Sequence, residues 1–425
     1  MRVKQLFRGR SAQTLFDQVL VSASNFITGI ILVRGLGLVE FGIFTVAYVV
    51  LLLANSVQLS FISSPMITLG SLYSSTDDRQ RFVRGMYGVQ LAFATVASPA
   101  ALVAVAIYFT LDRTGIPTGF LLSFAAAVAL FLMQDWLRRY FFTVGKPSAA
   151  VWNDAISYVG QVLALALLWM AHRLTIETAF WAMAMTSGLA FASGAILDRL
   201  RCNRAEMRDA WRRARGISVE LGISNQLQWL VYQGAMLIGA GVAGPQAAGG
   251  VRATQNVIGP VNVAFQAMEN IVPIRAAEEM RRGGIQKATG FLFRFGLAGF
   301  VALLILFSAA SLVSGRFLAF FYGHELQFYA GVLNLQLVYF LLAWPIRQLT
   351  FLFRTIESTR PILFASIVAA VASLSLVYPI VRSYGALGIV MAAVAGQICN
   401  LLYLVVAWMR VASTTRGKVV TAHPS

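Results

Sequence analysis

Hydrogen-bonding side chains recur along an otherwise apolar stretch of 25 residues, from Gly249 to Pro273. On a helix of 3.6 residues per turn, steps of three, four and seven residues return to the same side. Gly259 and Pro273 continue a seven-residue recurrence with Arg252 and Gln266. The polar positions fall on this one stripe: Arg252, Gln255, Asn256, Asn262, Gln266, Glu269 and Asn270. Amides can bind hydroxyl groups, and the arginine fork suits phosphate oxygens. The stripe therefore predicts the polar wall of a binding site.

Other apolar stretches contribute weaker polar stripes. Asn25 lies in the first of them, and Gln226 and Gln233 lie in the seventh. Together with the stripe at 249–273, these residues predict a hydrated cavity. We expect the two arginines Arg252 and Arg347 to bind the substrate together with a set of amides: Asn25, Gln226, Gln233, Gln255, Asn256, Asn262, Gln266 and Asn270.

Charged residues inside apolar stretches need a separate explanation, because a charge in hydrocarbon is costly unless it faces protein or water. Arg252, Arg294 and Arg347 each lie close to a helix end, so snorkelling to the interface is the alternative to facing a cavity. Asp17, Glu269 and Asp154 are candidates for ion or proton coupling. The positions of Asp17, Asp135 and Asp154 near helix ends equally allow pairing with Arg138 or Arg139, and Asp17 and Asp154 are expected to be peripheral.

The chain around these residues belongs in a bilayer, because 58% of its 425 residues are hydrophobic and only 12% are charged. A spanning helix needs roughly 20 apolar residues. Twelve such spans are predicted, near 14–33, 42–67, 86–110, 117–137, 149–171, 176–197, 217–241, 249–273, 289–313, 330–352, 361–380 and 385–408.

Positive charge predicts the orientation of these spans. The termini and the loops after even-numbered spans hold 26 Lys and Arg residues, whereas the loops after odd-numbered spans hold 5. Since Lys and Arg in short loops tend to stay cytoplasmic, both termini are predicted to be cytoplasmic. The same asymmetry accounts for the net charge of +17, so no nucleic-acid partner is expected.

A basic segment from Asp198 to Gly216 divides the chain into two halves of six spans each. The predicted organisation is a bundle at 1–197, a linker at 198–216, a second bundle at 217–409 and a cytoplasmic tail at 410–425. An even number of spans per half makes the halves a parallel pseudo-repeat. The linker composition fits an amphipathic helix on the membrane face; a binding site for another protein is the alternative.

Motifs of catalysis and of nucleotide hydrolysis are missing from the sequence. The pairs Gly145-Lys146 and Gly417-Lys418 are not followed by Ser or Thr, as a phosphate-binding loop requires, and neither HExxH nor GxSxG occurs. Cys202 and Cys399 have no plausible mutual partner, and the three histidines are scattered. We therefore expect no enzyme, no cofactor and no metal site.

Two stretches resemble bacterial polysaccharide flippases of the multidrug/oligosaccharidyl-lipid/polysaccharide exporter superfamily. The first is "FDQVLVSASNFITGIILVRGLGLVEFGIFTVAYVVLLL", with "RGLG" and "FG" between two spans, and the second is "DWLRRYFFTVGKPSAAVWND". The resemblance implies two helical bundles facing a cavity that opens alternately to each side. It implies an undecaprenyl-pyrophosphate-linked oligosaccharide as substrate, but it assigns no substrate-binding residue.

The function expected from this resemblance is a lipid-linked oligosaccharide flippase of the bacterial cytoplasmic membrane, serving lipopolysaccharide or exopolysaccharide synthesis. Its expected partners are membrane lipids and the polysaccharide polymerase and export machinery. Two alternatives stay open. A drug or metabolite exporter of the same superfamily would carry carboxylates deep in the first bundle. A membrane glycosyltransferase or polymerase would carry acidic residues in a large outer loop, and the outer loops here are short.

Overall fold

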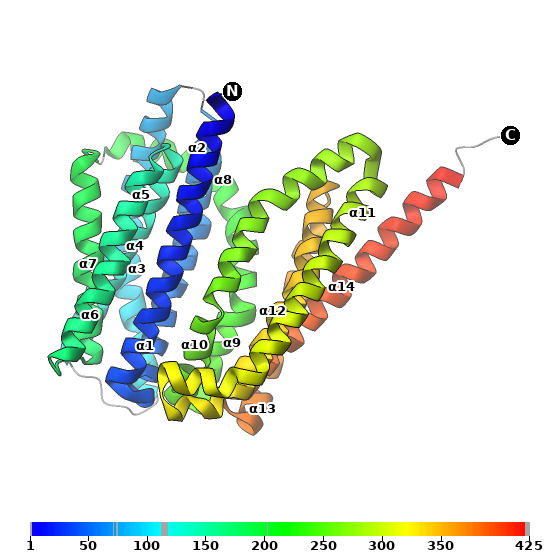
Figure 1. The fold of residues 1–425 in the computed structure, drawn as a ribbon. Coiled ribbons are helices and arrows are strands. Elements are labelled where there is room, and N and C mark those ends of the chain that lie inside the picture. The colour runs from blue at the N-terminus through cyan, green and yellow to red at the C-terminus, as the bar shows by residue number, and fades with distance from the viewer. Residues whose placement is uncertain (1, 71, 74, 112–117, 202, 421–425) are drawn as a thin grey trace. The chain divides into compact units, whose positions relative to one another are not determined.

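The computed structural model describes residues 2–70, 72–73, 75–111, 118–201 and 203–420, and all regular secondary structure within these ranges is helical (Figure 1). This agrees with a chain whose backbone groups must pair within each segment in hydrocarbon.

The first part of the chain forms seven α-helices with two π-helical turns. In order, they are α1 (Arg2–Gln58), a π turn (Leu59–Ser63), α2 (Ser64–Gly70), α3 (Thr76–Leu111), α4 (Thr118–Thr143), α5 (Pro147–Asp154), a second π turn (Ala155–Val159), α6 (Gly160–Met170) and α7 (Ile176–Leu197). Thr175 starts α7 with a capping box, since its hydroxyl accepts a hydrogen bond from the Thr178 N–H and the Thr178 hydroxyl accepts one from the Thr175 N–H.

The remaining helices include the longest one. In order, they are α8 (Arg204–Trp229), a π turn (Leu230–Gly234), α9 (Ala235–Ala243), α10 (Pro245–Val257), α11 (Gly259–Tyr322), a 3₁₀ turn (His324–Tyr329), α12 (Ala330–Thr355), α13 (Arg360–Tyr384) and α14 (Ala386–Val420).

Glycine breaks divide two of these helices into pairs of spans. Gly37 in α1 has φ 79°, and Gly284 in α11 has φ 67°, a conformation that disfavours residues with a Cβ. With these breaks, the described residues form twelve long segments that are helical nearly throughout, the eighth being interrupted at Ile258: 2–36, 38–70, 76–111, 118–143, 147–170, 176–197, 204–243, 245–282, 285–322, 330–355, 360–384 and 386–420. The prediction of an all-α membrane protein with twelve spans is confirmed.

Nine of the described helices are apolar and long enough to cross a membrane as they stand. One of them, Phe16–Gly70, contains the Gly37 break and accounts for two spans. The seventh predicted span is represented by the shorter apolar helix Leu230–Ala243, and the eighth begins in the more polar α10. The polar residues of these two spans explain why they are less apolar than the other spans.

The chain folds into two compact units whose borders lie inside continuous helices. Unit 1 comprises the residues up to Gln226 together with Gly244–Val263, and unit 2 comprises Leu227–Ala243 together with the residues from Ala264 onward. The segment 244–263 thus packs with the N-terminal helices, although it belongs to the second half of the chain. The division at 198–216 into two repeats stays a prediction.

Unit 1 is an antiparallel bundle in which successive helical segments alternate in direction (Figure 1). Its core contains aromatic and apolar side chains of α3, α4 and α8, among them Phe82, Met86, Trp136, Tyr140, Ala210 and Ala214. Close neighbours in the bundle are α4 with α7, α3 with α4 and α1 with α10. This packing fixes the positions of the polar side chains on the inner faces of α1, α4, α5 and α10.

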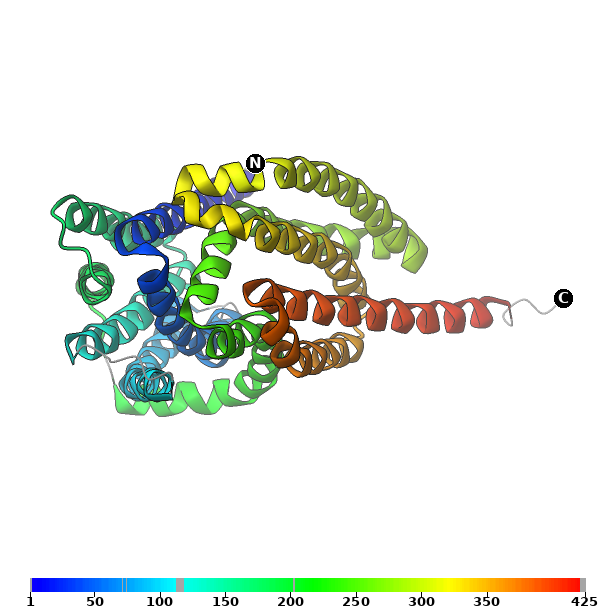
Figure 2. The ribbon, with the colours of Figure 1, turned by 90° about the horizontal axis from the view of Figure 1, so that it is seen from below.

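Unit 2 is built around α12, α13 and α14, and α13 and α14 lie side by side (Figure 2). Two hydrogen bonds tie its helices through backbone carbonyls. The Trp344 indole N–H donates to the Gly296 oxygen at 2.6 Å, and the Ser373 hydroxyl donates to the Val231 oxygen at 2.8 Å. The second bond uses a carbonyl in a π turn.

Candidate functional site

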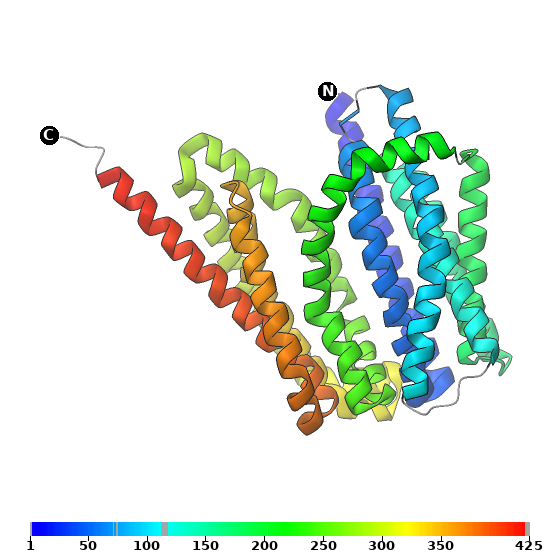
Figure 3. The same ribbon diagram turned by 180° about the vertical axis from the view of Figure 1, so that it is seen from behind.

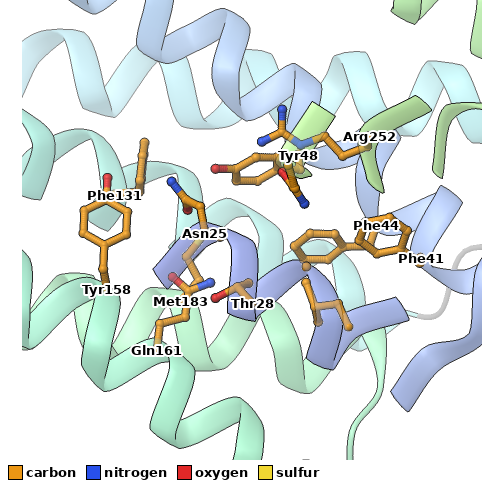
Figure 4. A pocket seen from close by; sticks show the side chains of 13 residues that line it. Asn25, Thr28, Phe41, Phe44, Tyr48, Phe131, Tyr158, Gln161, Met183 and Arg252 are labelled. Atoms are coloured by element: carbon orange, nitrogen blue, oxygen red, sulfur yellow. The ribbon is translucent and has the colours of Figure 1, made fainter. Parts of the chain in front are cut away.

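A small pocket lies inside unit 1, between α1, α4, the α5–α6 segment, α7 and α10 (Figure 4). Its polar lining residues come from three regions of the sequence: Asn25, Thr28 and Tyr48 from α1, Tyr158 and Gln161 from the α5–α6 segment, and Arg252 and Asn256 from α10. Arg252 carries the only charge among the lining residues, all of which are described. The pocket is therefore electropositive.

Arg252 is held by two neighbours within unit 1. Its guanidinium carbon lies 5.0 Å from the centroid of the Tyr48 ring, and its Nη1 donates a hydrogen bond to the Gln255 Oε1 at 3.1 Å. A cation–π contact of this kind contributes about 0.5–1 kcal/mol when exposed. No carboxylate in the described part of the chain pairs with Arg252, so its charge is available to an anionic group. Arg252 thus lines a pocket inside unit 1.

The pocket in this conformation has a volume of about 30 Å³, which is room for roughly two water molecules. Pockets that bind organic ligands usually measure about 300–1,000 Å³. A phosphate oxygen or a water molecule could reach Arg252 here, but a sugar ring would not fit without a change in the helix positions.

Close backbone contact brings α10 against α1 and so positions Arg252 near Tyr48. A Cβ added to Gly42 would overlap the backbone of Pro245 and Gln246, and one added to Gly249 would lie 3.0 Å from the Gly42 backbone. Gly244, with φ 84°, turns the chain before α10 starts at Pro245. Small residues at the contact are thus required for the position of Arg252.

We expect Gly42→Ala to lower the thermal stability of the purified protein, because the new methyl group overlaps the Pro245 carbonyl and pushes α10 away from α1. Overpacking of this kind costs about 1–3 kcal/mol. Gly216→Ala is the matched control: nothing lies within 4 Å of its Cβ position, so its melting temperature in detergent should equal or exceed that of the wild type. Equal melting temperatures for Gly42→Ala and wild type would contradict the required contact.

A second group of polar side chains is buried in unit 1, where Arg138 of α4 pairs with two carboxylates at once. Its Nη2 lies 2.5 Å from the Asp17 Oδ2, and its Nε lies 2.6 Å from the Asp154 Oδ2; both carboxylates are 0% exposed. The prediction of a peripheral position for Asp17 and Asp154 is wrong, because helices cover both side chains. The pairing of both carboxylates with Arg138 agrees with the alternative that the sequence allowed.

A neighbouring network surrounds Asp135, also of α4. Arg139 donates to both of its oxygens, at 2.9 and 3.1 Å. Asn55 and Gln58 donate to its Oδ2 at 3.1 and 3.2 Å, and Gln90 donates to the Gln58 Oε1 at 3.0 Å. Buried charges persist only when paired and hydrogen-bonded, and both carboxylate clusters meet that condition through arginine.

Amides complete the link between the Arg138 cluster and the neighbouring helix. Gln134 Nε2 donates to the Asn153 Oδ1 at 2.8 Å and to the Asp154 Oδ1 at 2.9 Å. The π turn that follows Asp154 includes the pocket residue Tyr158. The Arg138 cluster and the pocket therefore share one region of the α5–α6 segment. A π turn at this place fits a functional region, because π turns often occur at functional positions.

The second predicted phosphate-binding arginine lies in unit 2. Arg347 forms an ion pair with Glu269, and its guanidinium carbon lies 4.7 Å from the centroid of the Phe265 ring. The side chains of Arg347 and Glu269 are 30% and 44% exposed. Unlike Arg252, Arg347 has its charge balanced by a carboxylate, so an anionic ligand would have to compete with Glu269.

The predicted stripe at 249–273 does not lie on one continuous helix. The helix ends at Val257 and resumes at Gly259, because Ile258 forms a tighter turn in which its N–H bonds the Gln255 oxygen, and Pro260 has no N–H to donate. The prediction of a single helix is therefore wrong. Arg252, Gln255 and Asn256 precede the break, whereas Asn262 and Glu269 follow it.

The remaining predicted residues have separate positions. Gln226 donates to the Ser56 and Ser60 hydroxyls at 3.0 and 3.2 Å, which is a contact between helices of unit 1. Gln233 is half-buried in the π turn of unit 2, and Asn262 is exposed. The side chains of Gln266 and Asn270 lie outside the described residues. The structure thus brings Asn25, Arg252 and Asn256 together at the pocket, and Gln255 lies beside Arg252.

Several polar residues of the region were not singled out from the sequence. Tyr48, Tyr158 and Gln161 line the pocket, and Gln58, Gln90, Gln134 and Asn153 support the carboxylates. Their common signal is an amide or hydroxyl in the middle of a long apolar stretch. Such a signal shows its meaning only when the partner helix is known.

Solved structures of membrane transporters share this polytopic helical fold. Lipid II flippase MurJ in an inward closed conformation matches with a TM-score of 0.71 at 12% identity, over 94% of this chain and 87% of that chain. A multidrug resistance MATE family transporter of the MOP superfamily matches in its inward-facing conformation with a TM-score of 0.67 and in its outward-facing conformation with 0.64, each at 14% identity over 96% of both chains.

The chain therefore has the fold of MOP superfamily transporters, with twelve helices in two bundles. No family model and no curated protein matches the sequence. The matched structures are transporters, not enzymes. At these identities the likeness establishes the fold, and the cargo has to be argued from the residues.

Proposed function

We propose that the protein is a flippase that moves an undecaprenyl-pyrophosphate-linked oligosaccharide across the bacterial cytoplasmic membrane by alternating access. The observation that carries the proposal is the unneutralised guanidinium of Arg252 in a pocket whose lining holds no carboxylate. Anionic cargo fits this electrostatics, because a pyrophosphate needs fixed positive charge on its way through a low-dielectric region. MurJ, a flippase for lipid II, shares the fold.

The residues have distinct roles in this proposal. Arg252 binds the pyrophosphate in unit 1 and Arg347 binds it in unit 2, at different stages of transport. Amides bind the sugars, and Asn25 and Asn256 stand beside Arg252 in the pocket. Asp17, Asp154 and Glu269 are the candidates for ion or proton coupling. An ion gradient or consumption of the product supplies the energy, since the sequence has no nucleotide-hydrolysis motif.

A second candidate function is an ion-coupled exporter of drugs or metabolites, and one observation favours it. Asp17 and Asp154 are fully buried within the first bundle, where an exporter of that class would carry carboxylates. Against this, each carboxylate is paired with Arg138, and a carboxylate engaged by arginine is not available to a cationic drug. The oligosaccharide cargo is therefore the better-supported proposal.

Depletion of the protein in its native cell tests the proposed function. Completed repeat units on their lipid carrier should accumulate on the cytoplasmic side, while surface polysaccharide should fall, because transport is the step between synthesis and polymerisation. The measurement is mass spectrometry of extracted lipid-linked glycans, together with staining of surface polysaccharide. Normal glycan with increased drug sensitivity would favour the exporter, and accumulation of incomplete units would indicate an enzyme.

A further inference from the structure

The first turns of α8 pack on unit 1, and the same helix then continues into the seventh predicted span. Figure 3 shows this part of α8, drawn in green, lying across the end of unit 1 where α3 begins and α7 ends. One side, with Ala210 and Ala214, is buried in the core of unit 1 at 1% and 0% exposure. The orientation of the helix about its own axis is thus fixed by packing.

Two further contacts hold this orientation. A Cβ added to Gly85 of α3 would overlap the backbone of Glu206 and lie 2.6 Å from the Ala210 Cβ, so only glycine allows this approach. Arg213 Nη1 donates to the Tyr73 hydroxyl at 3.0 Å, and its Nη2 lies 2.9 Å from the Asp209 Oδ2. The helix therefore cannot rotate to bury a different face without losing these contacts.

The opposite side of the helix presents a row of positive charge. Arg204, Arg208, Trp211 and Arg215 follow at steps of four, three and four residues, so they share one side, and Arg212 lies beside them. All five side chains are exposed. None of the four arginines forms an ion pair with the described part of the chain. We name this surface, made of Arg204, Arg208, Trp211, Arg212 and Arg215, the arginine face.

We propose that the arginine face binds the phosphate groups of anionic membrane lipids at this end of unit 1. Continuity supports it: α8 runs without a break from this face into the seventh span, which holds it at the level of the headgroups. Composition supports it as well, because arginine forks suit phosphate oxygens and tryptophan favours the membrane interface. The proposal does not rest on the transported cargo.

Lipid titration of the full-length protein in detergent tests this proposal by native mass spectrometry. Phosphatidylglycerol should bind the wild type at least about tenfold more tightly than phosphatidylcholine, since polybasic surfaces attract anionic lipids. A variant with Arg204→Gln, Arg208→Gln, Arg212→Gln and Arg215→Gln should lose this preference. The same four positions changed to Lys should keep most of it, which separates a lost charge from a misfolded helix.

The matched control removes four exposed positive charges from unit 2 through Arg275→Gln, Arg281→Gln, Arg282→Gln and Lys287→Gln, and it should leave the preference unchanged. An equal loss in the control and in the arginine-face variant would overturn the proposal, because the preference would then reflect total charge. A preference that survives in the arginine-face variant would also overturn it, because the anionic lipid would then bind elsewhere on the protein. Competition by glycerol phosphate at equal concentration would show a site for free anions.

Discussion

Replacing Arg252 by alanine should lower transport of the lipid-linked oligosaccharide at least about thirtyfold while leaving the amount of protein in the membrane unchanged. Loss of one partner of a desolvated, charge-assisted contact costs about 2–5 kcal/mol, and about 1.4 kcal/mol corresponds to a factor of ten. Among the described residues, the Arg252 guanidinium has one hydrogen bond, to Gln255, and one ring contact, with Tyr48, so folding should depend little on it.

Graded substitutions at this position separate charge from geometry. Arg252→Lys keeps the charge but loses the fork that binds two phosphate oxygens, so it should keep part of the activity, and Arg252→Gln should keep little. Arg347→Ala should also abolish transport, although it leaves Glu269 without its ion-pair partner. The measurement is flipping of a lipid-linked oligosaccharide in proteoliposomes, normalised to the amount of reconstituted protein.

Arg294→Ala is the matched control for these variants, because Arg294 is an exposed arginine within a span of α11. Its transport rate should equal that of the wild type if it snorkels to the interface. Wild-type transport by Arg252→Ala would exclude the phosphate-binding role of Arg252. Disappearance of Arg252→Ala from the membrane would instead assign it a structural role, whatever its position in the pocket.

The number of spans could be predicted from the sequence because length and hydropathy decide it locally. A run of roughly 20 apolar residues needs no partner to be recognised. Breaks such as those at Gly37 and Gly284 are expected where a glycine and charged residues lie between two such runs. Continuity of a helix is harder to predict. The Gly259-Pro260 pair was visible within the polar stripe, yet only the structure shows that the turn at Ile258 separates Arg252 from Glu269.

The candidate site was predictable only where one helix carries several polar residues. Arg252 and Asn256 stand out by their spacing, and the structure places both at the pocket. By contrast, Gln58 and Gln90 are single amides on different helices, and their meaning depends on contact with each other and with Asp135. Periodicity describes one helix at a time, so it cannot show which buried amides share a carboxylate across the bundle.

The Arg138 cluster should be the most sensitive structural element of unit 1. Arg138→Met leaves the carboxylates of Asp17 and Asp154, both 0% exposed, without a cation. Removing one partner of a buried ion pair costs about 3–5 kcal/mol, so we expect a clearly lower melting temperature and less protein in the membrane. Asp17→Asn should be milder, because Arg138 and Asp154 remain as a neutral pair.

Compensating and exposed variants make this prediction specific. The triple variant Asp17→Asn, Arg138→Met and Asp154→Asn contains no unpaired charge, so it should recover most of the lost stability. Lys146→Met removes the exposed ion pair with Asp198, whose lysine is 51% exposed, and should change stability by less than about 1 kcal/mol. Equal melting temperatures for Arg138→Met and wild type would show that the carboxylates fold in their protonated, uncharged form.

The same triple variant also separates structure from coupling. If Asp17 and Asp154 serve only to neutralise Arg138, the stabilised triple variant should transport at the wild-type rate and respond to an imposed ion gradient as before. If either carboxylate carries the coupling ion or proton, the protein should remain stable but lose the response of transport to the gradient. Coupling is physically reasonable here, because two carboxylates that share one arginine leave one negative charge for a coupling cation. The measurement is flipping in proteoliposomes with and without the gradient.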